Sequence, residues 1–225
     1  MRPVNKGQAP RSYRKYGDAQ PDLVSQLGRF CPYCERHLPA GLAVEHKRPK
    51  SKYPAEELVW DNFLLSCPNC NSSKLAHRVI LSRYIWPDAD NTFRAFAYDQ
   101  NGIIRVRKCL PKKLRRRARR TIILLGLDKY PGQFREPTDR DYRWADRRKE
   151  WEKALVMRRQ LHEHDTPGQR EAIVKCAQDG IFSIWMDVFQ EDARLMQQLL
   201  YAFPGTALDC FDHRCHAVPR PGGCL

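Results

Sequence analysis

Two short cysteine pairs, Cys31-Pro-Tyr-Cys34 and Cys67-Pro-Asn-Cys70, decide how the N-terminal part of this chain folds. Each CxxC turn holds two sulfurs close enough to bind one metal ion, and four thiolates in a tetrahedron are preferred ligands of structural Zn²⁺. Zinc binding contributes on the order of 10 kcal/mol of folding free energy in small modules. The pairs therefore predict a zinc-braced unit, which we place at residues 29–80. Four reduced core cysteines with coincidental spacing are the alternative.

Chemistry-bearing side chains lie between and directly after the two pairs. An apolar run ends in Glu45 and His46, Asn62 precedes a second apolar run, and Asn71 and Lys74 follow the last cysteine. A neutral imidazole suits proton abstraction at physiological pH. Carboxylate and amide oxygens suit a hard cation such as Mg²⁺. Adjacent strand residues point to opposite faces, so Glu45 and His46 need a bend between them to share one centre.

This arrangement resembles the HNH endonuclease family, in the subgroup whose ββα-metal motif is braced by CxxC pairs. The three positions that name the family correspond to His46, Asn62 and Asn71, with asparagine where many members have a final histidine. The resemblance implies that His46 is the general base and that Asn62 orients the loop that carries it. It also implies that Glu45 and Asn71 bind a catalytic Mg²⁺ or Mn²⁺. Lys74 would contact a phosphate.

The chain is strongly basic, with 40 Lys and Arg against 26 Asp and Glu and a net charge of +14. Such an excess attracts a polyanion, for which nucleic acid is the first candidate and anionic lipid the second. No run approaches the ~18 apolar residues of a membrane span, and the N-terminus lacks the apolar core of a signal peptide. We therefore expect a cytoplasmic protein without membrane association. The predicted nucleic-acid contacts, which we expect to be with DNA, are Lys47, Arg48, Lys50, Arg115, Arg116 and Arg119.

The rest of the chain predicts an α+β fold, in which the ββα-metal core is followed by a β-hairpin and a mainly α-helical region. We expect residues 1–28 to form a basic arm and a short helix, and residues 213–225 to form a disordered tail. The hairpin is predicted around Asn101-Gly102, a strong turn signal. Residues 81–212 would hold this hairpin, over 93–106, and helices at 112–127, 139–163, 167–179 and 181–203. Solvated side chains are the alternative reading of the arginine-rich helix.

The wider layout resembles more narrowly the HNH nuclease subunit (PtuB) of retron-associated and Septu-type anti-phage systems. The matching stretches are the opening MRPVNKG, then YGDAQPDLV, and the NTFRAFAYDQNG hairpin. This resemblance implies an effector nuclease that works with an ABC-type, PtuA-like ATPase, and in some systems with a retron reverse transcriptase and its msDNA. The helical region would then dock the ATPase. A free-standing restriction- or homing-type HNH nuclease and a non-catalytic zinc module that binds nucleic acid remain the alternatives.

Overall fold

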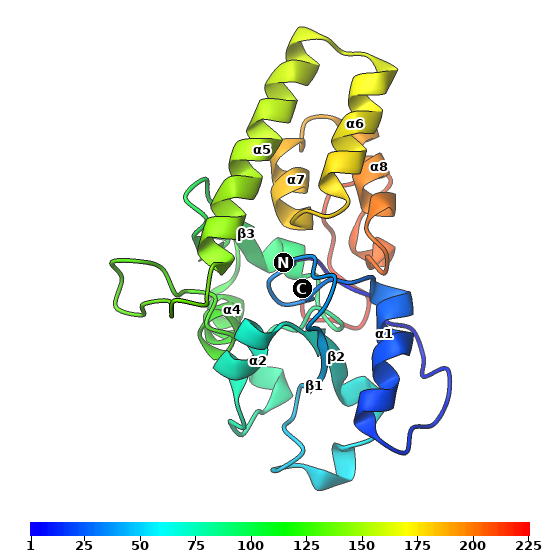
Figure 1. The fold of residues 1–225 in the computed structure, drawn as a ribbon, viewed down its shortest axis with the longest axis vertical. Coiled ribbons are helices and arrows are strands. Elements are labelled where there is room, and N and C mark those ends of the chain that lie inside the picture. Colours follow the sequence, from blue (N-terminus) through cyan, green and yellow to red (C-terminus); the bar gives the residue numbers. More distant parts are fainter.

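The two CxxC pairs enclose an antiparallel pair of strands, β1 (Ala43–His46) and β2 (Phe63–Ser66), which is followed by helix α2 (Pro68–Lys74). The structure is a computed structural model, and it describes residues 1–225. His46 pairs with Phe63 at the end of β1. Helix α2 begins after Cys67, whose sulfur accepts a hydrogen bond from the Cys70 amide, and proline suits the first turn. The predicted ββα order is confirmed, and Figure 1 shows this unit in the lower half of the molecule.

The first residues are built into the core and do not form an arm. Met1 and Val4 are fully buried, and Val4 forms a β-bridge with Thr206 near the other end of the chain. The Lys6 ammonium donates hydrogen bonds to backbone carbonyls that include those of Trp60 and Phe63. The prediction of a basic arm is therefore wrong for this opening segment. Its charges have partners inside the chain, which composition alone does not reveal.

The short helix predicted before the first cysteine pair is present. A 3-10 helix, η1 (Tyr16–Ala19), leads into α1 (Gln20–Leu27). Gly28 ends the helix with a φ of 72°, a conformation that glycine adopts without steric cost. Two further 3-10 turns, η2 (Pro54–Glu56) and η3 (Trp60–Asn62), lie between β1 and β2. A third, η4 (Leu81–Arg83), follows α2.

The second sheet is the predicted hairpin, made of β3 (Phe96–Tyr98) and β4 (Ile104–Val106). It starts later than predicted, because Asn91 caps a short helix, α3 (Thr92–Ala95), and its side chain accepts from the amides of the next turn. At the tip, Gly102 has a φ of 77°, and a Cβ there would lie 2.2 Å from the Trp144 carbonyl oxygen. Glycine is thus required where the hairpin meets the following helices. Helix α4 (Lys112–Leu124) comes next.

Four helices form the upper half of the molecule in Figure 1: α5 (Arg143–Glu163), α6 (Pro167–Ala177), α7 (Phe182–Val188) and α8 (Ala193–Ala202). The single helix predicted over 181–203 is two helices. Asp192 starts the second one, because its carboxylate accepts from the Leu195 amide at 2.9 Å. No helix combines the length and apolar character needed to cross a bilayer.

The C-terminal segment is packed against the rest of the protein, so the prediction of a disordered tail is wrong. The Asn91 side-chain amide donates to the carbonyls of Cys210, in η5 (Leu208–Cys210), and Val218, both at 2.7 Å. Leu225 is buried, and its carbonyl accepts from the Arg220 amide. Buried polar side chains from a distant part of the chain hold the tail in place, so its order could not be predicted from hydrophobic periodicity.

Candidate functional site

The sulfurs of Cys31, Cys34, Cys67 and Cys70 converge at one buried point, with all four within 4.8 Å of one another. The sulfurs of Cys34 and Cys67 are 3.7 Å apart. This is close to the ~3.8 Å expected between ligands when four Zn–S bonds of ~2.3 Å form a tetrahedron. No other group of three or more His, Cys, Asp or Glu ligand atoms converges in the structure. The cluster therefore fits structural zinc.

Arginines from outside the cluster offset its negative charge. Four thiolates and one Zn²⁺ carry a net charge of −2, which is costly to bury without cations nearby. Arg143, at the start of α5, is buried and donates to the Cys70 sulfur at 3.2 Å. Arg36 follows the first cysteine pair. Burial lowers the pKa of its guanidinium, but the charges of Cys34 and Cys67 and an ion pair with Asp146 of α5, at 2.9 Å, raise that pKa overall. These contacts fix α5 to the cluster.

His46 lies at the end of β1 with its ring between two aromatic side chains. The ring centroids of Tyr16 and Phe63 lie 4.9 and 5.2 Å from its own. Its Nε2 is 2.9 Å from the carbonyl oxygen of Glu57. A carbonyl can only accept, so the neutral imidazole carries its proton on Nε2 and keeps a lone pair on Nδ1. The residue is only 8% exposed, so its ring lies largely within the protein.

Burial of the imidazole lowers the pKa of His46 below its ordinary value. The hydrogen bond to the Glu57 carbonyl acts in the opposite direction, and the positive charge of Lys50 adds to the lowering. Nitrogen Nδ1 therefore stays unprotonated to lower pH than in a solvent-exposed histidine.

Asn62 is buried and binds the loop that follows β1. Its side-chain oxygen accepts from the Arg48 amide at 2.7 Å, and its nitrogen donates to the Arg48 carbonyl at 2.9 Å. The same nitrogen donates to the Glu56 carbonyl at 3.2 Å. Because Glu57 is the next residue, these bonds fix the segment whose carbonyl contacts His46. Both N–H groups of the side-chain amide, and one lone pair of its oxygen, are thus used within the chain.

Glu45 and Lys74 form a buried ion pair on the other side of β1. The Lys74 ammonium is 2.6 Å from the Glu45 carboxylate and donates to the His46 carbonyl at 2.6 Å. The Tyr33 hydroxyl donates to the second carboxylate oxygen at 2.8 Å. Burial raises the pKa of Glu45, and Lys74 and Tyr33 oppose that shift. The Lys74 side chain is only 1% exposed and ties α2 to β1, so its ammonium faces Glu45 and His46 and not the surface, where the sequence predicted a phosphate contact.

The sequence comparison agrees with this geometry. A family model described as HNH endonuclease matches residues 31–76. This stretch is an HNH endonuclease domain. It contains both cysteine pairs, both strands of the first sheet and α2, and it supports nuclease activity in general. No curated protein matches the chain.

The two predicted ligands of a catalytic cation differ in their accessibility within the HNH domain. Asn71 lies exposed on α2, and its side-chain amide has no partner in the chain. Both carboxylate oxygens of Glu45 already have partners, in Lys74 and Tyr33. A carboxylate and an amide oxygen are donors that a hard divalent cation takes, so the residues fit Mg²⁺ or Mn²⁺ in kind. A cation bound at Glu45 would share that carboxylate with Lys74.

Three of the basic side chains predicted to contact nucleic acid lie in the HNH domain, and all three are paired. The Lys47 ammonium is buried 2.6 Å from Asp88, so its predicted contact with nucleic acid is wrong. Arg48 pairs with Glu56, and Lys50 pairs with Glu57 at 2.9 Å. The Lys50 ammonium also lies over the ring of Tyr16, 4.4 Å from its centroid. The three predicted arginines outside the domain, Arg115, Arg116 and Arg119, are exposed on α4.

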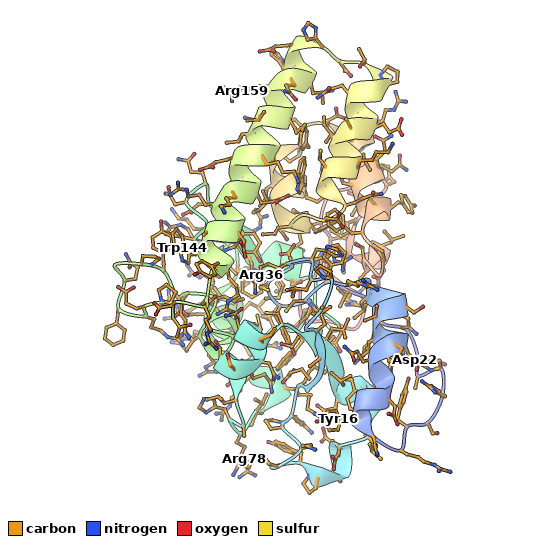
Figure 2. The ribbon with its side chains drawn as sticks, in the orientation of Figure 1. Tyr16, Asp22, Arg36, Arg78, Trp144 and Arg159 are labelled. Carbon is orange, nitrogen blue, oxygen red and sulfur yellow. The ribbon has the colours of Figure 1, made fainter.

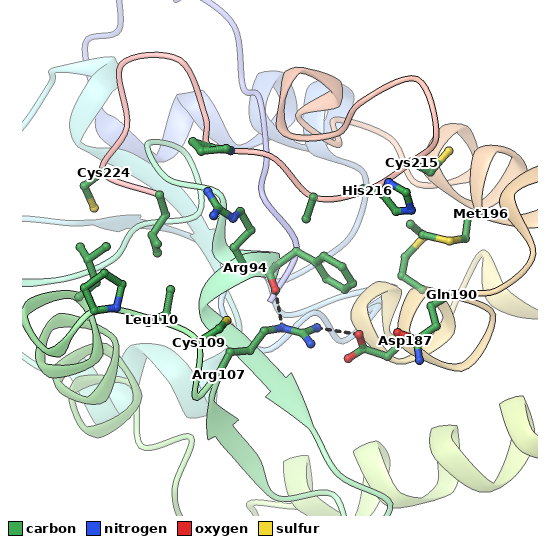
Figure 3. Close-up of a pocket in the computed structure, with 17 residues that line it drawn as sticks. Arg94, Arg107, Cys109, Leu110, Asp187, Gln190, Met196, Cys215, His216 and Cys224 are labelled. Atoms are coloured by element: carbon green, nitrogen blue, oxygen red, sulfur yellow. Dashed lines mark hydrogen bonds and ion pairs between the residues drawn. The ribbon is translucent and has the colours of Figure 1, made fainter.

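A cavity of about 690 Å³ lies outside the HNH domain, between α3, the segment that joins β4 to α4, the helices α7 and α8, and the C-terminal segment. Figure 3 shows Arg107 at its wall, where the guanidinium contacts Asp187 at 2.6 Å and the Phe93 carbonyl at 3.0 Å. None of the site residues predicted from the sequence lines it. The cavity therefore lies apart from the site residues predicted from the sequence.

Tyr16, the Glu57 carbonyl and Arg143 are parts of the site that the sequence did not reveal. Figure 2 shows Tyr16 beside the lower part of the HNH unit, although it precedes Cys31 by 15 residues in the sequence. In the sequence, the only feature that pointed to Tyr16 is the aromatic and basic run Tyr13-Arg-Lys-Tyr16. A backbone carbonyl leaves no signal in a sequence. Arg143 is one of many arginines, and nothing in its neighbours distinguishes it.

Replacing a zinc ligand should remove the metal and the fold of the HNH domain together. We expect Cys67→Ser to bind less than one zinc per chain and to unfold at a lower temperature, because the cluster supplies most of the stability of a two-stranded unit. Metal content by mass spectrometry and thermal unfolding by circular dichroism measure both effects. The exposed Cys109 lies outside the cluster, so Cys109→Ser should keep its zinc. Full zinc content in Cys67→Ser would rule out the cluster as the binding site.

Removing Lys74 should leave the Glu45 carboxylate buried without a cation. We expect Lys74→Met to lower the free energy of unfolding by ~3–5 kcal/mol, as for other broken buried pairs. The double variant Glu45→Gln, Lys74→Met should recover part of this loss, because the uncompensated charge is gone. Urea unfolding measures each value, with the exposed Lys112→Met as the control. A double variant that is no more stable than Lys74→Met would contradict the role given to the ion pair.

Proposed function

We propose that the chain is a metal-dependent endonuclease that hydrolyses phosphodiester bonds in DNA, with His46 as general base. The observation that carries this proposal is the hydrogen bond from His46 Nε2 to the Glu57 carbonyl. It sets the tautomer that leaves Nδ1 able to accept a proton. The HNH domain at residues 31–76 and the net charge of +14 support the same activity and a polyanionic substrate.

In the proposed reaction, His46 Nδ1 takes a proton from a water molecule while the water oxygen attacks the phosphorus atom. A new P–O bond forms, the bond from phosphorus to the 3′ oxygen breaks, and that oxygen leaves with the electron pair and is protonated by solvent. Mg²⁺ or Mn²⁺ held by Glu45 and Asn71 would supply charge neutralisation at the phosphate and the leaving oxygen. Within the chain, Asn62 keeps the Glu57 carbonyl in place and Lys74 holds the backbone of His46.

We also propose a more specific role, as the effector nuclease of an anti-phage complex with an ABC-type ATPase. Its support is the resemblance of the opening segment and of the second hairpin to the HNH subunit of Septu-type and retron-associated systems. In this role the helices α5 to α8 would carry the docking surface, and a retron reverse transcriptase with its msDNA would be a further component in retron-associated forms.

Replacing the proposed base should stop cleavage and leave the fold intact. We expect His46→Ala to cut plasmid DNA ~10²–10⁴-fold more slowly than the wild type in Mg²⁺ or Mn²⁺, because general-base catalysis contributes about that much. Its zinc content should be unchanged. The matched control is His162→Ala, an exposed histidine on α5 that should keep full activity.

The same assay, run with the chain alone and with the proposed ABC-type ATPase partner added, separates the alternatives. Cleavage that needs the ATPase supports the defence role, whereas efficient cleavage by the chain alone supports a free-standing nuclease. DNA binding without divalent-dependent cleavage under either condition would overturn the enzymatic proposal in favour of a zinc-containing binding module.

The pH dependence of cleavage should reflect the buried imidazole. Because burial lowers the pKa of His46, the base stays active below its ordinary value of 6.5, and kcat/KM should fall only as the pH drops through a lower midpoint. A pH–rate profile between about pH 5 and 8 measures this midpoint. Tyr16→Ala uncovers the ring and should move the midpoint upward. An acid-side midpoint at or above 6.5 in the wild type would contradict the assignment.

A further inference from the structure

Six basic side chains line one face of α4. They occupy positions i, i+1, i+3, i+4, i+7 and i+8, a spacing that places them on one side of a helix. All six are exposed, whereas Ala118, Thr121 and Ile122 on the opposite side are buried. We call this set the α4 stripe; its members are Lys112, Lys113, Arg115, Arg116, Arg119 and Arg120.

The positive charge of the α4 stripe has no compensation within the chain. None of the six side chains forms an ion pair, and α4 contains no acidic residue. Two hollows of about 470 Å³ each adjoin the stripe, and Arg83 of η4 joins the lining of the first. No acidic side chain lines either hollow. Like charges at these spacings repel one another, so the stripe favours binding of a polyanion.

Helix α4 is held rigidly against the HNH domain. Gly126, just after the helix, packs so closely on α2 that a Cβ there would lie 2.5 Å from the Ser73 hydroxyl oxygen. Arg143 donates to the Gly126 carbonyl at 2.8 Å and to the Cys70 sulfur at 3.2 Å. Within the helix, the Thr121 hydroxyl accepts from the Ile85 amide at 2.8 Å. The stripe is therefore fixed relative to α2, the helix that carries Asn71.

We propose that the α4 stripe binds the phosphate backbone of the duplex DNA that the HNH domain cuts, an inference that rests on the proposed nuclease function. From Lys112 to Arg120 the helix rises about 12 Å. A strand of B-DNA presents a charge every ~3.4 Å, so the stripe spans about three to four phosphates. The stripe carries no aromatic ring, which the stacking of single-stranded bases would require. Contacts of this kind position the substrate without reading its sequence.

The experiment measures binding of a fluorescent 20-base-pair DNA duplex as a function of salt, in the His46→Ala background so that the duplex stays intact. We compare the unaltered stripe with the triple variant Arg115→Gln, Arg116→Gln, Arg119→Gln. Each phosphate contact contributes ~0.9 to the slope of log K against log salt, so the triple variant should lower that slope by up to ~2.7. Affinity at low salt should fall at least ~10-fold.

A control variant loses the same charge elsewhere. Lys149, Arg159 and Arg194 are exposed on α5 and α8, and replacing all three with Gln should leave the slope unchanged. Equal slopes for the α4 variant and the unaltered stripe would overturn the inference, as would an equal loss in the control. Tighter, stripe-dependent binding of single-stranded DNA or duplex RNA would overturn the assignment to duplex DNA.

Cleavage of a small diester separates this inference from the proposed function. Bis(p-nitrophenyl) phosphate is too short to reach the stripe, so with His46 present the triple variant should cleave it at the wild-type rate and cut plasmid DNA more slowly. If the wild type cleaves neither substrate while duplex binding still depends on the stripe, the nuclease proposal fails and the binding surface stands. If the wild type cuts plasmid DNA and the triple variant cuts it equally well, the inference fails and the nuclease proposal stands.

Discussion

The convergence of four cysteine sulfurs is the constraint on which the rest of the site depends. A two-stranded sheet and a helix of seven residues bury too little apolar surface to hold one geometry alone. The cluster closes the chain between Cys34 and Cys67 and so brings β1, β2 and α2 together. It also creates a buried negative charge, which explains why Arg36 and Arg143 are placed where they are.

Short series of contacts connect His46 to this cluster and fix its position. Helix α2 carries Cys70 of the cluster and, about one turn later, Lys74, whose ammonium donates to the His46 carbonyl. On the opposite side, Asn62 holds the loop whose Glu57 carbonyl meets the imidazole. The backbone and the ring of the histidine are thus held separately. A general base needs this kind of restraint, because proton transfer depends on short and well-aligned contacts.

The sequence predicted those parts of the structure that depend on local spacing. The CxxC pairs indicated the four-cysteine cluster, Asn101-Gly102 indicated a hairpin, and the helix predicted to begin at residue 167 begins there. It failed where distant polar groups meet. The order of the tail depends on Asn91, far away in sequence, and the burial of Lys47 depends on Asp88.

The same limit applies to the candidate site. The side chains of His46, Asn62 and Asn71 stand at family spacing, so they could be singled out without coordinates. Their partners could not, since a backbone carbonyl and a tyrosine before the first cysteine pair have no motif. The roles of these side chains in catalysis remain predictions.

The HNH domain depends on contacts with Lys6, Tyr16 and Arg143. All three lie outside residues 31–76, yet they hold β2, cover the imidazole and neutralise the sulfurs. A recombination event that moved only this segment into another protein would leave behind its counter-charge and its aromatic cover. Transfer of the site to another protein would therefore require this flanking sequence as well as residues 31–76.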